Sequence, residues 1–255
     1  MKLIEINKEN IDNEHICCAI GNDKTNKKRA ESKKKWMQKR FEEGLIFKRI
    51  DDRGKMFIEY MPVEKCWKPV KGKNQLIINC LWVSGKFKKQ GIAATLLDEC
   101  IKDARSSGKD GICVISSGVK KPFLTDKSFF IRNGFKTIEK APPYFELLYL
   151  DLSGKGKAPH LSPEVSTGKC GVKEGFHFLY SDQCPFMEEY VNIMAEALRT
   201  KNISSSVEKL KSSSRAQKSP CAFGTLGIFY KGNLITHELI PPRKLDKFIE
   251  KVTEK

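Results

Sequence analysis

The sequence has 255 residues, of which 40% are hydrophobic, and it carries a formal net charge of +16. This length allows two ordinary domains, and fifteen Phe against eleven Pro argue against an unstructured chain. No segment approaches the ~18 consecutive apolar residues of a membrane span, so we expect no membrane partner. The N-terminus lacks the basic start and apolar middle of a secretion signal, and we expect a cytoplasmic protein.

The first 152 residues alternate between strand and helix patterns, which predicts an α/β (α+β) fold. Strands are expected at residues 2–6, 45–50, 55–61, 76–83, 111–116, 135–139 and 144–151. Helices are expected at residues 32–43, 92–104 and 126–132. The strand at 76–83 has hardly a polar residue, which is typical of a central strand buried on both faces.

Much of the positive charge lies between residues 24 and 40. A basic run of this kind can form a patch for nucleic acid or another polyanion. Trp36, Met37 and Phe41 recur at helical spacing, however, so we interpret the lysines as the solvated face of a helix. No nucleic-acid motif accompanies the charge, and a nucleic-acid partner is not expected.

Nine cysteines are present, an odd number, and none of them forms a CxxC pair. A structural zinc site uses short paired spacings, so we expect no metal site. Most of the thiols are expected to be reduced and buried, since a free Cys behaves as a small hydrophobe.

The composition changes at residue 153, where a stretch rich in Gly, Pro and Ser begins. We interpret residues 153–168 as a linker and residues 169–255 as a second domain. In the second domain, strands are expected at 176–180, 205–210, 226–230 and 234–239, and helices at 185–199, 213–218 and 242–252.

A lysine-rich and glycine-containing loop follows the buried strand that ends at Leu81-Trp82-Val83. A helix then begins among small residues at Ile92-Ala93-Ala94. The free N–H groups and the dipole of a helix N-terminus favour phosphate, and Gly91 allows the close approach of a pyrophosphate. The same pattern is compatible with a plain loop carrying solvated lysines.

The motif Lys88-Lys89-Gln90-Gly91-Ile92-Ala93 resembles the CoA loop of the GNAT acetyltransferase family. Lys88 replaces the usual Arg or Gln of the family and keeps the charge. Residues 129–135, with an aromatic pair followed by Gly-Phe, resemble the family's later motif. The resemblance covers residues 1–152. It implies a mixed central sheet, acetyl-CoA as co-substrate, and transfer of its acetyl group to an amine. The positive charge of the chain would then also attract CoA.

The resemblance also implies site residues. The strands before the loop and after its helix splay apart in this family, and the thioester lies in the gap. The CoA contacts implied in this sequence are those of Leu81, Trp82, Val83, Lys88, Lys89, Gln90, Gly91, Ile92, Ala93, Ala94 and Ser117.

Acetyl transfer also needs a base for the amine and an acid for the leaving thiolate. Glu59 is our candidate base, with an ordinary strand carboxylate as the alternative. Phe130 stands where many members of the family carry a Tyr that protonates the thiolate of CoA. Phe cannot donate a proton, so the acid comes from elsewhere in the chain or from solvent. Tyr144, Ser116 and Ser117 are candidates for it, each with an ordinary strand-end or turn residue as the alternative.

In the second domain, a strand and a short polar turn lead to Cys184-Pro185, which we expect to open a helix. A helix N-terminus stabilises a thiolate, so Cys184 is a candidate reactive thiol, although a half-buried structural Cys is the alternative. The segment resembles the one-Cys members of the thioredoxin and glutaredoxin fold, with Met187 in place of the second Cys. The cis-Pro of that fold is absent near Gly224, and the resemblance brings Cys221 within reach of Cys184.

The whole chain resembles a bacterial group of GNAT proteins with a C-terminal YoaP-like domain. We predict an N-acetyltransferase domain at 1–152 and a smaller thioredoxin-like domain at 169–255. The acceptor is expected to be an amine of a small molecule or a protein, and a homodimer is possible. The second domain would recognise the acceptor or control the enzyme by redox state. The alternative is a non-catalytic CoA-binding sensor or adaptor.

Overall fold

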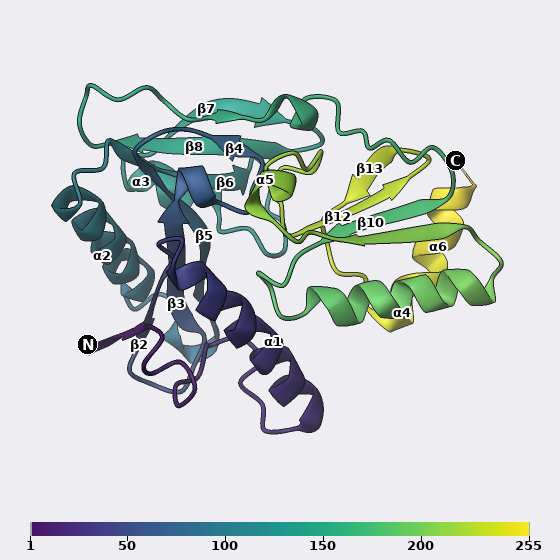
Figure 1. Cartoon of the computed structure of the whole chain (residues 1–255), viewed down its shortest axis with the longest axis horizontal. Coiled ribbons are helices and arrows are strands. Elements are labelled where there is room, and N and C mark those ends of the chain that lie inside the picture. Colours follow the sequence, from purple (N-terminus) through teal and green to yellow (C-terminus); the bar gives the residue numbers. More distant parts are fainter. Residues whose placement is uncertain (1, 255) are drawn as a thin grey trace. The chain divides into compact units, whose positions relative to one another are not determined.

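The computed structural model describes residues 2–254 and divides them into two compact units (Figure 1). Unit 1 comprises the chain up to Cys66, together with Val70–Lys140 and Tyr144–His160. Unit 2 comprises the chain from Leu161 onward, together with Trp67–Pro69 and Ala141–Pro143. The second unit therefore takes in two short segments that precede its main part in the sequence.

Unit 1 is built on one mixed sheet with the strand order β1-β2-β3-β5-β6-β8-β7. The strands are β1 (Leu3–Ile6), β2 (Ile46–Ile50), β3 (Met56–Pro62), β5 (Gln75–Val83), β6 (Gly111–Ser117), β7 (Lys136–Ala141) and β8 (Phe145–Asp151). Strands β5 and β6 pair in parallel, whereas β1–β2, β2–β3, β3–β5 and β6–β8 pair antiparallel. The mixed central sheet that the sequence predicted is confirmed.

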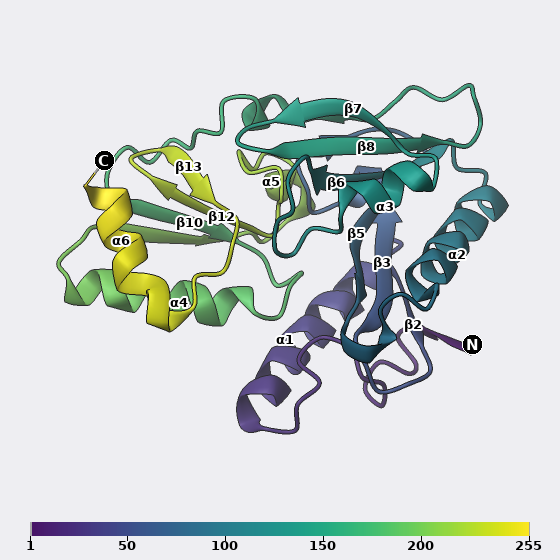
Figure 2. The same cartoon turned by 180° about the vertical axis from the view of Figure 1, so that it is seen from behind.

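Helices cover both faces of this sheet. Successive side chains of a strand point to opposite faces, so neighbouring residues of β3 contact different helices. Ile58 and Tyr60 of β3 belong to a hydrophobic core with α2 (Ile92–Ser106) and α3 (Lys127–Arg132). Glu59, between them in sequence, bonds to Lys33 of α1 (Lys24–Phe41). Helix α1 therefore covers one face, and α2 and α3 cover the other (Figure 2).

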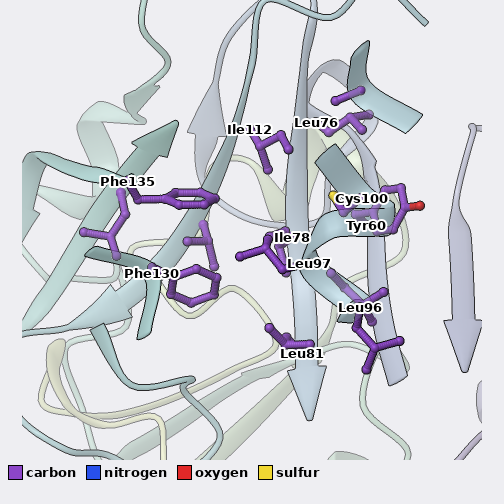
Figure 3. Close-up of a cluster of buried hydrophobic side chains, with 14 of the residues drawn as sticks. Tyr60, Leu76, Ile78, Leu81, Leu96, Leu97, Cys100, Ile112, Phe130 and Phe135 are labelled. Carbon is purple, nitrogen blue, oxygen red and sulfur yellow. The ribbon is translucent and has the colours of Figure 1, made fainter. Parts of the chain in front are cut away.

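The core between the sheet and α2 is drawn in Figure 3. Leu96, Leu97 and Cys100 of α2 are fully buried there against strand residues such as Ile78. Phe130 of α3 belongs to the same cluster, with its ring centroid 5.1 Å from that of Phe135. Burial of these apolar side chains fixes α2, and with it the loop that precedes α2, on the sheet.

Unit 2 contains a second mixed sheet with the strand order β11-β10-β12-β13. Its elements are β10 (Phe176–Tyr180), α4 (Met187–Thr200), β11 (Ser205–Lys209), α5 (Ser213–Ala216), β12 (Leu226–Tyr230), β13 (Asn233–Thr236) and α6 (Leu245–Thr253). Strands β10 and β11 are parallel, and β12 is antiparallel to both β10 and β13. Two parallel strands joined through α4 are thus followed by an antiparallel hairpin and a last helix.

Short elements complete the chain, including the two-residue strands β4 (Val70–Lys71) and β9 (His160–Leu161), which pair with each other. The single-turn helices are η1 (Val63–Lys65), η2 (Gly85–Phe87), η3 (Pro163–Val165) and η4 (Pro242–Lys244). Strand β9 and η3 fall within residues 153–168, so part of the expected linker has regular structure.

Several predicted boundaries are wrong. Helix α1 begins at Lys24 rather than at residue 32, because the Asp23 side chain caps it by accepting from Asn26 N. The last helix begins at Leu245, after η4, and β13 ends at Thr236 rather than at residue 239. Within residues 2–254, no helix has both the length and the apolar character needed to cross a membrane.

Candidate active site

Strands β5 and β6 pair only along their first halves and then separate. Their parallel register runs from Gln75 opposite Gly111 to Ile78 opposite Val114, while β6 continues beside β8 as far as Ser117. We call the opening between the outer halves of β5 and β6 the fork. It is the splay of the two strands that the GNAT resemblance implied.

An irregularity in β5 marks the start of the fork. On its other side β5 pairs with β3, where Glu59 lies opposite Cys80 and Tyr60 lies opposite Ile78. Asn79 is therefore the extra residue of a β-bulge, which bends a strand and redirects its side chains. The bulge coincides with the position at which β5 leaves β6.

Thr125 spans the fork from the segment that follows β6. Its hydroxyl donates to the carbonyl of Leu81 on β5 at 2.9 Å, and its own carbonyl accepts from Ser116 Oγ on β6 at 2.8 Å. Leu81 is predicted to contact the pantetheine arm through its backbone. Its carbonyl already accepts the hydrogen bond from Thr125. Ser116, a candidate acid, is occupied in this bridge.

The predicted CoA loop connects β5 to α2. Trp82 and Val83 end β5, where they pair with Phe57 and Met56 of β3. Gly91 is the N-cap of α2 and has a left-handed φ of 77°, which favours glycine. An added Cβ at Gly91 would meet no atom within 4 Å, so the space in front of the helix is open.

The surroundings of this helix start suit an anion. Lys88, Lys89 and Gln90 are exposed beside it, and the first turn of α2 at Ile92-Ala93-Ala94 carries no acidic side chain. The N–H groups of a first turn have no partner inside their own helix. A phosphate placed there gains these donors, the dipole and the nearby lysine charges.

Ser117 lies at the wall of a pocket of about 490 Å³ beyond the end of β6. Lys120, Lys121, Lys127 and Arg132 also line this pocket, so its walls are strongly basic. The Ser117 hydroxyl bonds to Val119 O in the same loop. This pocket suits an anionic group.

Glu59 is buried in a polar cluster between β3, α1 and the bulge. Its Oε2 accepts from Lys33 Nζ at 2.5 Å, and its Oε1 accepts from Asn79 Nδ2 at 3.0 Å. The side chains of Lys33 and Glu59 are each 2% exposed. The ammonium group of Lys33 also lies 4.3 Å from the ring centroid of Trp36. The candidate base is thus linked to the fork through Asn79.

Tyr144 lies just before β8 and is partly exposed. Its carbonyl accepts from Gly118 N at 3.3 Å, and Lys121 Nζ lies 4.4 Å from its ring centroid. This candidate acid therefore sits with the loop that follows β6, whereas Phe130 is 0% exposed and packs in the core. Phe130 has no group that can transfer a proton.

Cys184 lies in the turn between β10 and α4, in unit 2. Helix α4 begins at Met187 with Phe186 as its N-cap, so Cys184-Pro185 does not open the helix, contrary to the prediction. The turn is closed by Met187 N, which donates to Cys184 O at 3.3 Å. Lys209 lies near the same turn, where its Nζ is 2.9 Å from Asp182 Oδ2.

Cys221 is 0% exposed, and its thiol donates to Leu226 O at 3.3 Å. Burial raises the pKa of this thiol to about 12. Neither Cys184 nor Cys221 forms a disulfide with any described residue. The resemblance to the thioredoxin fold brings Cys221 within reach of Cys184, but this structure contains no disulfide bond between them.

The sequence reasoning missed Lys33, Asn79 and Thr125. Asn79 was open to detection, because it is a carboxamide in a strand that is otherwise almost entirely apolar. Lys33 looked like one of many exposed lysines, and only the fold brings it to Glu59, 26 residues away in the sequence.

Comparison with known proteins identifies the family. Residues 9–135 match the sequence profile of the acetyltransferase (GNAT) family, and residues 206–247 match the YoaP-like profile. The uncharacterized N-acetyltransferase YoaP of Bacillus subtilis (strain 168) is 39% identical over 249 residues, which cover 98% of each chain. The chain belongs to the YoaP family of GNAT N-acetyltransferases. As a YoaP-family protein it is an acyl-CoA-dependent N-acetyltransferase with acetyl-CoA as its co-substrate.

Solved structures similar to this YoaP-family chain include other acetyltransferases. Ribosomal-protein-alanine N-acetyltransferase from Brucella melitensis is 15% identical, with 60% of this chain and 100% of that chain covered and a TM-score of 0.43. PaiA N-acetyltransferase from Thermoplasma acidophilum, in complex with coenzyme A, is 16% identical, with 60% and 100% covered and a TM-score of 0.42.

Proposed function

We propose that acetyl transfer takes place in the fork between β5 and β6. The observation that carries this proposal is the combination of the fork with an open helix N-terminus at the end of β5. In this arrangement the pyrophosphate of CoA binds at Lys88–Ala94, and the pantetheine arm follows β5 past Leu81, Trp82 and Val83. The thioester then reaches the bulge at Asn79. Ser117 borders the basic pocket at the other arm of the fork.

The reaction joins the amine nitrogen to the acetyl carbonyl carbon and breaks the C–S bond. The electron pair of that bond leaves with sulfur, one amine proton goes to a base, and the thiolate takes up a proton. We assign Glu59 as the base, acting directly or through water, and Tyr144 as the donor to the thiolate. The hydrogen bond from Asn79 to Glu59 supports the first assignment, since it links the carboxylate to the bulge.

Turnover of acetyl-CoA with a panel of primary and secondary amines tests this proposal. Glu59→Gln is expected to lower turnover by at least tenfold at pH 7, with CoA affinity by calorimetry within about twofold of wild type. Tyr144→Phe is expected to lower turnover in the same way. Unchanged turnover in either variant rejects that residue's assignment, and a loss of CoA binding in Glu59→Gln points to a structural role.

We further propose that unit 2 is a thioredoxin-like domain that recognises the acceptor or controls the enzyme by redox state. The strand order β11-β10-β12-β13 supports this, as does the position of Cys184 between β10 and α4. Met187 stands in place of the second Cys, is buried at the start of α4 and has no thiol. The thiol chemistry would therefore involve Cys184 alone. Cys184→Ser is expected to change the KM of a thiol-bearing acceptor or the response to mild oxidation. An enzyme that changes in neither respect has no such function in unit 2.

A further inference from the structure

The fork contains a hydrogen-bond acceptor whose capacity is not used. Asn79 donates through Nδ2 to Glu59, but its Oδ1 is buried and has no hydrogen-bond partner within the described residues. Buried side-chain oxygens in folded proteins are nearly always hydrogen-bonded. An exception at the start of the fork therefore calls for a functional explanation.

The orientation of this carboxamide is set by its neighbour. A carboxylate accepts hydrogen bonds only, so the NH₂ group of Asn79 must face Glu59 and its oxygen must face elsewhere. Glu59 itself is held by Lys33 at 2.5 Å, and both side chains are almost fully buried. The interactions from Lys33 through Glu59 to Asn79 thus fix the orientation of one buried carbonyl oxygen that has no donor among the described residues.

The donor has a natural source in the reaction. Asn79 is the bulged residue at which β5 leaves β6, and the proposed path of the thioester along β5 ends there. An amine that attacks the thioester directs its lone pair at the carbonyl carbon. Its N–H groups then point away from that carbon and need acceptors.

Resting on the proposed function, we infer that Asn79 Oδ1 binds an N–H group of the acceptor amine and selects primary amines. A neutral primary amine has two N–H groups. One proton passes to the base as the N–C bond forms and the C–S bond breaks. The other stays on nitrogen, bonded to Asn79, and becomes the N–H of the product amide. A secondary amine keeps no N–H once its proton has been transferred, so it leaves Asn79 Oδ1 unpaired.

The test uses two synthetic probes that combine CoA with an acceptor. In the first, the sulfur of CoA carries CH₂–CO–NH–butyl, and in the second the same amide nitrogen is methylated. Calorimetry measures the affinity of the full-length enzyme for both probes and for CoA alone. The wild-type enzyme is expected to prefer the N–H probe by about five- to tenfold, the size of one hydrogen bond.

The preference for the N–H probe should depend on residue 79. In Asn79→Leu it is expected to fall to about one, with CoA affinity within about twofold of wild type. If Asn79→Leu does not fold, Asn79→Ala takes its place, and its preference for the N–H probe is also expected to fall to about one. Gln38→Met is the matched control, because it removes a carboxamide of α1 that donates to Asp12, and it keeps the wild-type preference.

The outcomes separate the two proposals. Equal binding of both probes by the wild-type enzyme overturns the role of Asn79, and so does an unchanged preference in both Asn79 variants. A wild-type enzyme that binds neither CoA nor the probes overturns the proposed function together with this inference.

Discussion

Gly91 combines two properties that a phosphate-binding helix start requires. Its left-handed φ of 77° starts α2, and its missing side chain leaves the space before the first turn open. Gly91→Val is expected to weaken CoA binding by more than tenfold, or over ~1.4 kcal/mol, because the side chain holds the pyrophosphate away. Calorimetry with CoA measures this.

A control variant is needed to tell whether Gly91→Val weakens CoA binding through backbone strain or by blocking access to the phosphate site. Gly108, just past the other end of α2, has a φ of 62° and equally open surroundings. Gly108→Val therefore introduces comparable strain without touching the loop, and its CoA affinity should match wild type. Equal losses in both variants would attribute the effect to strain in α2 and not to phosphate binding.

Phe130 is a core residue at a position where the family often carries a catalytic Tyr. Its ring packs between those of Phe129 and Phe135, with centroids 5.3 and 5.1 Å away. Phe130→Leu is expected to lower the free energy of unfolding by ~1 kcal/mol or more through lost packing. Turnover per folded molecule should stay within a few-fold of wild type, as should that of Phe130→Tyr. A collapse of turnover in a stable Phe130→Leu enzyme would contradict this.

The thiols of unit 2 should differ in reactivity. Burial raises the pKa of Cys221 to about 12, so only about one molecule in ten thousand is a thiolate at pH 8. Cys184 lies partly exposed in its turn, and we expect it to be alkylated first. Alkylation across pH 6–9 with mass-spectrometric mapping measures the order. Cys170 is the internal control, because it is also partly exposed but burial raises its pKa. Faster labelling of Cys170 than of Cys184 would refute the reactive-thiol assignment.

At the scale of elements, the sequence predicted the strands better than the helix starts. The strands β5, β6, β10 and β12 are apolar runs, and their pattern located them to within one residue. The first two turns of α1 contain no large apolar residue that would mark a buried face, so the helix was expected eight residues too late. The pairs β4–β9 and Lys33–Glu59 depend on segments far apart in the chain, and no local pattern reports such contacts.

The bulge at Asn79 shows the same limit within the site. A bulge is defined by the register of two strands, so β5 alone does not reveal it. The glycines and lysines of the CoA loop, by contrast, are local requirements of one turn and one helix start. This is why the loop was predictable and the polar cluster beside it was not.

Helix α3 is tied to β8 and β7 through Glu146. Burial by itself raises the pKa of this carboxyl, but hydrogen bonds from Lys127 and Thr137 outweigh that effect, and the pKa is lowered. A carboxyl whose pKa in the folded state is lower than its unfolded value of 4.5 stabilises the protein at pH values above 4.5. This stabilisation is lost as the pH falls through the pKa of the folded state.

Lys127→Met is therefore expected to lower the free energy of unfolding by ~1 kcal/mol at pH 7, and the difference from wild type should shrink below about pH 4. Urea denaturation at pH 7 and pH 3.5 measures both values. Lys136→Met, at an exposed lysine of β7, is the control and should behave as wild type. A difference that persists unchanged at low pH would rule out the ion pair as its cause.

At the scale of the molecule, the formal charge of +16 bears on substrate capture. CoA carries several phosphate charges, and attraction between opposite charges accelerates encounter at low ionic strength. The association rate of CoA in stopped flow should fall several-fold as added salt shortens the screening length below ~10 Å. S-acetyl-pantetheine lacks the phosphates, so its rate should change little. Equal salt responses of the two ligands would contradict this role of the charge.

The two short segments Trp67–Pro69 and Ala141–Pro143 have a consequence for how this protein can be divided. Lys68, in the first of them, is buried and donates through Nζ to Phe223 O at 2.9 Å, inside unit 2. A fragment cut at residue 169 would therefore leave the second unit without two of its own pieces. A clean separation would require grafting both segments onto the fragment. A single cut in the sequence therefore does not yield an intact second unit.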